Sequence, residues 1–239
     1  MGKRIVSEEQ SKAAKKRKKV ERELLIEVVE SIHSQLQPSV LEIGAHTGNM
    51  IELIYAWNES AKVFAVEPLD SNIKTLNSKF PNAKLSIFKG LIGSTMGKRE
   101  LFISDLKAKK KNADCSMYKG SAEKNNAGIK KVITENTYTM EYICKELKLS
   151  HIDLLSINCE GGEYDIFESD NMDFLDNVDM IYMHMHTKSK LFLSDEYRKK
   201  RVRIMDLLAN RGFTMQGMDD VDAIAHIIQL WKKPESNNK

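Results

Sequence analysis

The stretch Glu42-Ile43-Gly44-Ala45-His46-Thr47-Gly48 decides the fold of this chain. It follows the apolar residues Val40 and Leu41 and leads into an amphipathic segment, so it predicts a strand, a glycine turn and a helix in succession. Gly44 lets the chain turn sharply off the strand, and Gly48 lets a ligand or a helix approach the backbone. We therefore expect a ligand site at the end of this first strand.

The residue at position 46 indicates which ligand the turn suits. Dinucleotide-binding turns read glycine-x-glycine-x-x-glycine, and their middle glycine makes room for a pyrophosphate. His46 occupies that place here. S-adenosylmethionine has no phosphate, and its charged amino acid and sulfonium suit the carboxylate of Glu42 and the open backbone groups of the turn. The turn therefore favours S-adenosylmethionine as the cofactor.

A second acidic side chain, Glu67, follows the next predicted strand and precedes Pro68. A carboxylate at the end of the second strand can accept hydrogen bonds from both ribose hydroxyls. The alternative is structural, with Glu42 capping a helix and Glu67 ending a strand in solvent. The predicted cofactor-binding residues are Glu42, Gly44, Ala45, His46, Gly48, Glu67, Pro68 and Asn158.

Around the turn, short apolar runs alternate with amphipathic stretches, which is typical of βα units around a mostly parallel sheet. Strands are predicted at 40–43, 61–67, 84–88, 99–104, 152–158 and 180–185, and helices at 49–57, 71–80, 140–147, beyond 162, and at 196–210. The final segments, 213–218 and 223–231, must pair antiparallel, because a parallel crossover needs a dozen or more residues. The prediction is a Rossmann-like α/β fold: a seven-stranded, mostly parallel sheet with helices on both faces and a carboxy-terminal antiparallel hairpin.

We divide the chain into three parts. Residues 1–37 form a basic segment and a helix, since 8–36 lacks proline and glycine and carries an apolar stripe. Residues 38–234 form the main domain, interrupted by a polar insertion at 105–130, and 235–239 form a disordered tail. Two basic runs, 15–19 and 107–111, either bind phosphate-rich partners or are solvated.

Composition narrows the class of protein. The 37 basic and 34 acidic residues leave a net charge of +3, which gives no argument for nucleic acid or a membrane surface. Three cysteines at no metal-like spacing indicate reduced thiols and a cytoplasmic protein. No apolar run reaches the about 18 residues that a membrane span needs. The oligomeric state, including a homo-oligomer, is left open.

From about residue 39 to 232 the chain resembles the FkbM family of methyltransferases, which have the class I methyltransferase fold. The segments that carry the resemblance are VLEIGAHTGNM, VFAVEPLDSNIKTL, FKGLIGSTMGK and IDLLSINCEGGEYDIF. The family's strand-four signature reads lysine-x-aspartate-x-glutamate-glycine followed by a further glutamate. Here Glu160, Gly161 and Glu163 match, Ser156 stands for the lysine, and Asn158 stands for the aspartate.

Two further segments resemble family motifs with substitutions. ITENTYTMEYI is similar to a threonine-leucine-aspartate stretch, with Thr139 in place of the aspartate. MIYMHMH is similar to a strand that ends in valine-glutamate-x-histidine, with His186 matching and His184 replacing the glutamate.

In an open α/β sheet the ligand crevice lies beyond the carboxyl ends of the strands. His186 or Glu160 is the predicted base for a hydroxyl acceptor, and Asn158 orients the acceptor or the methionine moiety. Alternatively, His184 and His186 are structural. No metal is predicted, although His184, His186 and Glu160 offer a metal-assisted variant. Ser116 and Tyr118, in the insertion, either reach over the cofactor or belong to a surface loop.

The resemblance implies an S-adenosylmethionine-dependent O-methyltransferase that acts on a hydroxyl of a sugar, glycan or secondary metabolite. The basic insertion adds the option of an acidic acceptor. The main alternative is a non-catalytic scaffold that has kept the cofactor fold. A nucleic-acid methyltransferase is less favoured, because Asn158 is followed by Cys159-Glu160-Gly161, whereas amino-methylating enzymes have two prolines and an aromatic residue there.

Overall fold

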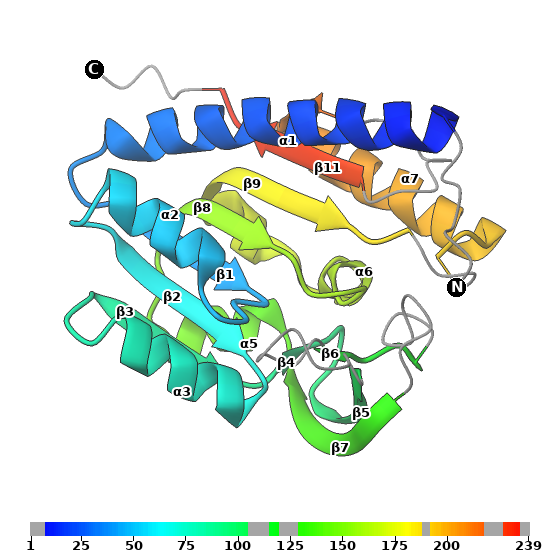
Figure 1. Ribbon diagram of the computed structural model, residues 1–239, viewed down its shortest axis with the longest axis horizontal. Coiled ribbons are helices and arrows are strands. Elements are labelled where there is room, and N and C mark those ends of the chain that lie inside the picture. Colours follow the sequence, from blue (N-terminus) through cyan, green and yellow to red (C-terminus); the bar gives the residue numbers. More distant parts are fainter. Residues whose placement is uncertain (1–7, 105–114, 120–128, 188–191, 218–226, 235–239) are drawn as a thin grey trace.

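The computed structural model describes residues 8–104, 115–119, 129–187, 192–217 and 227–234, with side chains from residue 15 onward (Figure 1). A seven-stranded sheet forms its centre, in the order β10-β11-β9-β8-β1-β2-β3. The strands are β1 Ser39–Ile43, β2 Lys62–Glu67, β3 Leu85–Lys89, β8 Ile152–Ile157, β9 Val178–Met185, β10 Thr214–Gly217 and β11 Ile227–Lys232. Parallel pairing links β3, β2, β1, β8 and β9, whereas β11 is antiparallel to both β9 and β10. The predicted mostly parallel sheet and carboxy-terminal hairpin are confirmed.

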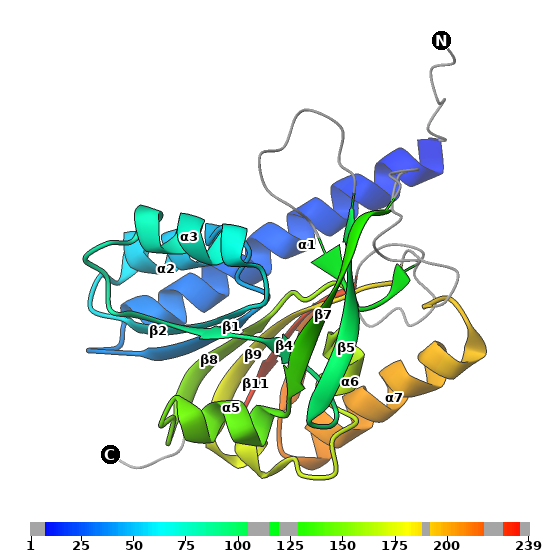
Figure 2. The same cartoon turned by 90° about the horizontal axis from the view of Figure 1, so that it is seen from below.

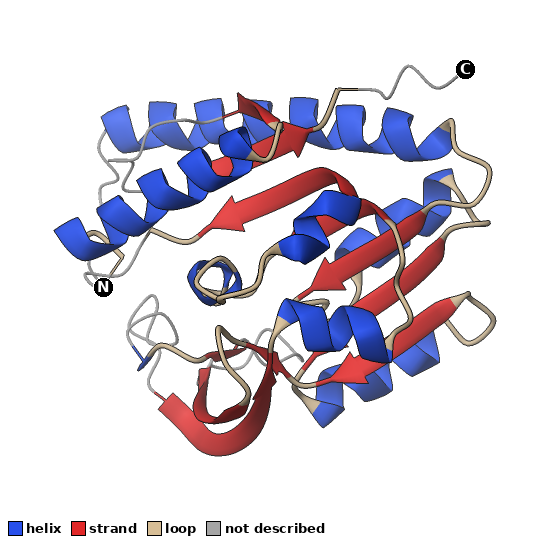
Figure 3. Cartoon of the chain, turned by 180° about the vertical axis from the view of Figure 1, so that it is seen from behind, coloured by secondary structure: helices blue, strands red, loops and turns tan. Residues whose placement is uncertain are grey.

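Helices cover both faces of this sheet (Figures 2 and 3). One face carries α1 Glu8–His33, α2 Asn49–Trp57 and α3 Asp70–Lys79, and the other carries α5 Met140–Glu146, α6 Glu163–Ile166, the 3-10 helix η2 Asp173–Asn177 and α7 Asp195–Asn210. Alternation along the strands divides the core in two. Val40 and Leu154 pack under α1 and α2, while Leu41 and Leu155 pack on the opposite side. Because both faces are covered, these strands read as nearly continuous apolar runs.

The amino-terminal helix packs on the sheet along its carboxy-terminal half. Its predicted stripe is confirmed, since Leu24, Val28 and Ile32 are all buried against strand residues. Asn58, just after α2, donates hydrogen bonds to the carbonyls of Ile32 and Gln35, which fixes the end of the helix. None of the described helices is long and apolar enough to cross a membrane.

A second, four-stranded sheet stands beside the first, in the order β4-β7-β5-β6. It consists of β4 Leu91–Ile92, β5 Gly97–Ser104, β6 Cys115–Ser116 and β7 Ile129–Tyr138. β5 was predicted, but the expectation that regular structure resumes only at residue 140 was wrong. β7 is a ten-residue strand paired antiparallel with β5.

Sequence periodicity missed β7 for a physical reason. Its residues are mostly exposed or half-buried, and only Thr137 is buried, so the strand has no apolar face to detect. Backbone hydrogen bonds to β5 hold it in place. Most of the predicted insertion, 105–114 and 120–128, lies outside the described residues, as do 218–226 in the hairpin connection and the predicted tail, 235–239.

Candidate active site

A pocket opens at the carboxyl ends of β1, β2 and β8, where an open α/β sheet is expected to bind its ligand. The second sheet forms its other wall. The lining residues are Glu42, Ile43, Gly44, Ala45, His46, Asn49, Met50, Val66, Glu67, Pro68, Gly90, Leu91, Ile92, Leu101, Cys115, Ser116, Met117, Asn158, Cys159 and Glu160. All the predicted cofactor residues line this pocket except Gly48.

The glycine turn has a backbone that side chains would disturb. Gly44 has a φ of 81°, and a Cβ there would lie 2.3 Å from the carbonyl oxygen of Asn158. Gly48 also has a φ of 81°, but its Cβ would meet the side chains of Leu76 on α3 and of Phe80 just after this helix. Gly44 therefore allows β1 and β8 to approach each other, and Gly48 makes room for a helix rather than for the ligand. His46, between them, adopts a φ of 50°, which is uncommon for a residue with a side chain.

Glu42 is a buried carboxyl group that faces the pocket with incomplete pairing. Its side chain hydrogen-bonds with Ser156, while Oε2 has no hydrogen-bond partner among the described residues. Burial raises the pKa of Glu42 from 4.5 to about 8. A buried acceptor that is short of a partner suits a cationic group of a ligand.

Glu67 holds the turn together from β2. Its Oε2 accepts a hydrogen bond from the backbone nitrogen of His46 at 2.8 Å, and Oε1 accepts from the backbone nitrogen of Leu69 and from Asn72 Nδ2, both at 3.0 Å. Burial nevertheless raises the pKa of Glu67. Since a carboxylate oxygen can accept two hydrogen bonds, Oε2 keeps capacity for one more donor from the pocket.

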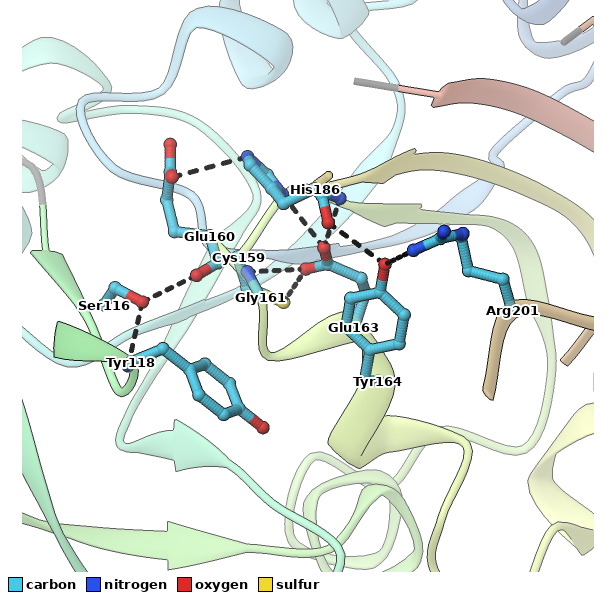
Figure 4. Close-up of polar contacts among 9 residues, drawn as sticks. All are labelled: Ser116, Tyr118, Cys159, Glu160, Gly161, Glu163, Tyr164, His186 and Arg201. Carbon is cyan, nitrogen blue, oxygen red and sulfur yellow. Dashed lines mark hydrogen bonds and ion pairs between the residues drawn. The ribbon is translucent and has the colours of Figure 1, made fainter. Parts of the chain in front are cut away.

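Glu160, His186 and Glu163 form a linear arrangement beside the pocket (Figure 4). Glu160 lines the pocket with a φ of 55°, and its Oε2 lies 3.4 Å from Nε2 of His186. Nδ1 of His186 lies 3.0 Å from Oε1 of Glu163. The side chain of Glu160 is 30% exposed and that of His186 is 4% exposed. Glu160 therefore faces the pocket. His186 lies behind Glu160 and not in the crevice, where it was expected.

Glu163 matches a family motif, but no role was predicted for it from the sequence. Its carboxylate is fully buried and accepts hydrogen bonds from the backbone nitrogens of Gly161 at 2.9 Å and His186 at 2.6 Å. Burial acts to raise its pKa, yet the charge and hydrogen bonds of His186 together lower it. The side chain thus ties the turn after β8 to the end of β9. The only signal in the sequence was an acidic residue just after two glycines.

Two tyrosines and a serine lie around the group formed by Glu160, His186 and Glu163 (Figure 4). Tyr164 donates from its hydroxyl to the carbonyl of His186, and the buried Arg201 donates to the Tyr164 hydroxyl. Ser116 donates to the carbonyl of Glu160 at 2.6 Å and accepts from the backbone nitrogen of Tyr118. Ser116 therefore lines the pocket and fixes the Glu160 loop, whereas Tyr118 is not among the lining residues.

The family model of the methyltransferase FkbM domain matches residues 42–215, which include every residue of the pocket. The chain belongs to the FkbM methyltransferase family. No curated protein matches the chain significantly.

Solved structures with a similar arrangement include three methyltransferase-related proteins. Precorrin-6y C5,15-methyltransferase from Geobacter metallireducens is 11% identical, with 89% of this chain and 88% of that chain covered and a TM-score of 0.46. An rRNA methylase from Streptococcus thermophilus is 10% identical, with 86% and 93% covered and a TM-score of 0.46. Fibrillarin from Aeropyrum pernix, with natively bound S-adenosyl-L-methionine, is 10% identical, with 81% and 66% covered and a TM-score of 0.40. These similarities carry no inference about the acceptor.

The departures from the FkbM pattern have distinct structural settings. Ser156 replaces the lysine, so Glu42 has only a hydroxyl partner from this position. Asn158 replaces the aspartate and lines the pocket without charge. Thr139 caps α5 by accepting from the backbone nitrogen of Tyr142, and it does not line the pocket.

The expectation that His184 faces the crevice at the end of its strand was wrong. Its Nε2 lies 3.1 Å from the Tyr182 hydroxyl, on the face of the sheet that α1 covers, and it does not line the pocket. Burial, followed by the charge of His186, lowers the pKa of His184 to about 4. The trio of His184, His186 and Glu160 is therefore not brought together, and the metal-assisted variant has no support from this geometry.

The pocket also contains Cys159, whose thiol donates to Glu163 at 3.7 Å. Burial, together with nearby carboxylates, raises the pKa of this thiol well above its ordinary value. Cys159 therefore stays protonated and is a poor nucleophile.

Proposed function

We propose that this FkbM protein is an S-adenosylmethionine-dependent O-methyltransferase that acts on a hydroxyl of a sugar, glycan or secondary metabolite. The observation that carries the proposal is the position of Glu160, a carboxylate in the wall of the pocket with His186 behind it. Transfer to a hydroxyl oxygen needs a group that accepts the hydroxyl proton, and Glu160 is placed to do so.

The cofactor half of the pocket fits S-adenosylmethionine. Glu42 offers a buried carboxyl oxygen to a cationic group, and the Gly44 turn exposes backbone where an added Cβ would have no room. Glu67 and Pro68 line the pocket at the end of β2, and we assign them to the ribose. When bound, the cofactor supplies an electrophilic methyl group on a sulfonium sulfur.

The chain's own groups handle the proton. As the carbon–sulfur bond breaks and the carbon–oxygen bond forms, the hydroxyl proton passes to the carboxylate of Glu160. His186 supports Glu160 through Nε2, and Glu163 fixes the imidazole through Nδ1 and the backbone. Asn158 has no charge at neutral pH, so we assign it to orienting the acceptor or the methionine moiety through its amide.

A non-catalytic cofactor-binding scaffold is the second candidate. The observation that favours it is the loss of the lysine and the aspartate of the family's strand-four signature, at Ser156 and Asn158.

We also propose that the protein works in the cytoplasm. The three cysteines, Cys115, Cys144 and Cys159, form no disulfide, which fits a reducing compartment and either candidate function.

Two measurements separate the candidates. Isothermal titration with S-adenosylmethionine tests the cofactor site, and transfer of a labelled methyl group tests turnover on a panel of glycans, hydroxylated metabolites and RNA. We expect binding, turnover on a hydroxyl acceptor, and loss of turnover in Glu160→Gln with cofactor affinity unchanged. Binding without transfer to any acceptor would favour the scaffold, and transfer to a base nitrogen would contradict O-methylation.

A further inference from the structure

The basic end of α1 lies near the edge of the sheet at which the pocket opens. Two contacts fix the course of the helix. Glu27 pairs with Lys232 Nζ at 2.5 Å, beside the start of β9, and Leu24 packs against Gly217, near the end of β9. From its carboxy-terminal end backward, α1 therefore runs toward the carboxyl edge of the parallel strands (Figure 1), and Leu24 lies level with Met183, two residues before the end of β9.

The residues before Leu24 continue toward that edge, with Val20 still packed against the core. At 1.5 Å per residue, Lys19 lies about 8 Å and Lys15 about 14 Å farther along the helix axis. Arg17 is close enough to His184, at the end of β9, for its charge to contribute to the lowered pKa of that imidazole. The basic run therefore lies near the carboxyl end of β9, at the same edge of the sheet as the pocket.

Residues 15–23 of α1 are strongly basic, and most of their basic side chains are exposed. Residues 15–23 contain six basic and two acidic side chains. Lys15, Lys16 and Lys18 are exposed and make no ion pair with any described residue, while Lys19 lies 3.7 Å from Glu23. Three unneutralised ammonium groups thus point to solvent within about one helical turn.

A second pair of lysines stands on the other side of the strand ends. Lys130 and Lys131, at the start of β7, are exposed and also make no ion pair with the described part of the chain. In Figure 1 the ends of β8 and β9 lie between the amino-terminal end of α1 and the start of β7. The approach to the pocket is therefore flanked by positive charge from two elements far apart in sequence.

We propose that the surface formed by Lys15, Lys16 and Lys18 of α1 and Lys130 and Lys131 of β7 binds an acidic glycan. We further propose that such a glycan is the acceptor in the proposed methylation. The inference rests on the proposed function and specifies its substrate class. Neither 15–23 nor 129–133 contains an aromatic residue, whereas single-stranded RNA is usually held by aromatic side chains stacked on its bases. Lysines alone attract anionic groups without reading bases, which suits the carboxylates, sulfates or phosphates of a glycan chain.

The test uses a heparin hexasaccharide as the acidic-glycan probe and an oligouridylate of equal charge as the RNA probe, each titrated at several salt concentrations. The variant is Lys15→Glu/Lys16→Glu/Lys18→Glu. Its matched control, Lys62→Glu/Lys84→Glu/Lys145→Glu, reverses three exposed lysines at the opposite edge of the sheet. Titration with S-adenosylmethionine checks that all the proteins are folded.

We expect the unmodified protein to bind the hexasaccharide more tightly than the oligouridylate, and salt to weaken binding. The α1 variant should bind the hexasaccharide about tenfold more weakly, and the control should differ little. Equal weakening in the control, tighter binding of the oligouridylate, or no binding of the hexasaccharide would overturn the inference. Methyl transfer to a neutral acceptor by a protein that ignores the hexasaccharide would overturn the inference and keep the proposed function. Hexasaccharide binding without methyl transfer to any acceptor would overturn the proposed function and the assignment of the glycan as acceptor, and would leave only the glycan-binding surface.

Discussion

The two halves of the pocket are built in different ways. Around β1 and β2 the site depends on backbone conformation, with positive φ at Gly44, His46 and Gly48 within five residues of one another. Around β8 and β9 it depends on side chains from distant segments, above all Glu163 and His186. In the first half, steric exclusion leaves no room for other side chains, so we expect few substitutions to be tolerated. In the second half, the chemistry depends on side chains, which substitution can change. Of the departures from the FkbM pattern, Ser156 and Asn158 lie on or just after β8 and His184 lies on β9, whereas Thr139 caps α5.

The largest effect should come from Gly44→Val. A Cβ at this position would lie 2.3 Å from the Asn158 carbonyl oxygen, so β1 and β8 must separate at the pocket. We expect S-adenosylmethionine binding to be abolished in an isothermal titration. Gly212→Ala is the matched control, because Gly212 has a φ of 83° but no atom within 4 Å of its Cβ position. It should cost only the backbone strain of about 1–2 kcal/mol and leave binding intact. Unchanged affinity in Gly44→Val would mean that the cofactor site is elsewhere.

The second prediction addresses the side-chain half. Glu160→Gln should lower turnover by about a hundredfold or more, because it removes the group that accepts the hydroxyl proton. His186→Ala should lower turnover less, about tenfold, because His186 acts through Glu160. Labelled methyl transfer measures turnover, and a thermal melt shows whether His186→Ala also loosens the buried Glu163. A greater loss of turnover in His186→Ala, with stability retained, would make His186 the base.

The third prediction concerns pH. The pKa of Glu42 is raised from 4.5 to about 8, so the carboxyl is neutral over most of the range between these values in the ligand-free protein. If a cationic ligand group binds the ionised form, cofactor affinity should rise by up to about tenfold per pH unit below pH 8 and then level off. Glu42→Gln should flatten this profile. A pH-independent affinity in the unmodified protein would separate Glu42 from the ligand.

The same shift predicts how stability changes with pH. Because the folded protein holds this proton more tightly than the unfolded chain, the contribution of Glu42 is fully present below about pH 4.5 and is lost as the pH rises through 8. Glu42→Gln should remove this component. The free energy of unfolding, measured by denaturant titration across this range in both proteins, gives the difference.

The smallest effect should come from Thr139→Asp, which restores the family's residue. Thr139 accepts a hydrogen bond from the backbone nitrogen of Tyr142 as the cap of α5, and aspartate caps a helix equally well. We expect stability to change by less than about 0.5 kcal/mol and turnover to change little. A large rise in turnover would show that the missing carboxylate takes part in the chemistry.

Local pattern predicted most of the main sheet but, of the second sheet, only β5. The apolar runs of β1, β2, β8 and β9 are buried on both faces, so hydrophobicity identified them within a residue or two. β7 is mostly polar, with exposed or half-buried residues, and depends on its pairing with β5, which no periodicity reveals. Residues 115–117 in the predicted insertion line the pocket, and β6 is held there by its pairing with β5.

By itself, the sequence determined the βα order, the glycine turn and the two acidic strand ends, because these follow from local backbone geometry and from which residues must be buried. Only the tertiary structure decided which of the candidate catalytic groups line the pocket and which lie behind it. It placed Glu160 in the pocket wall, His186 behind it and His184 under α1, since side-chain direction beyond a strand end depends on partners such as Glu163 and Tyr182. Long-range packing also brought the basic end of α1 to the edge of the sheet at which the pocket opens.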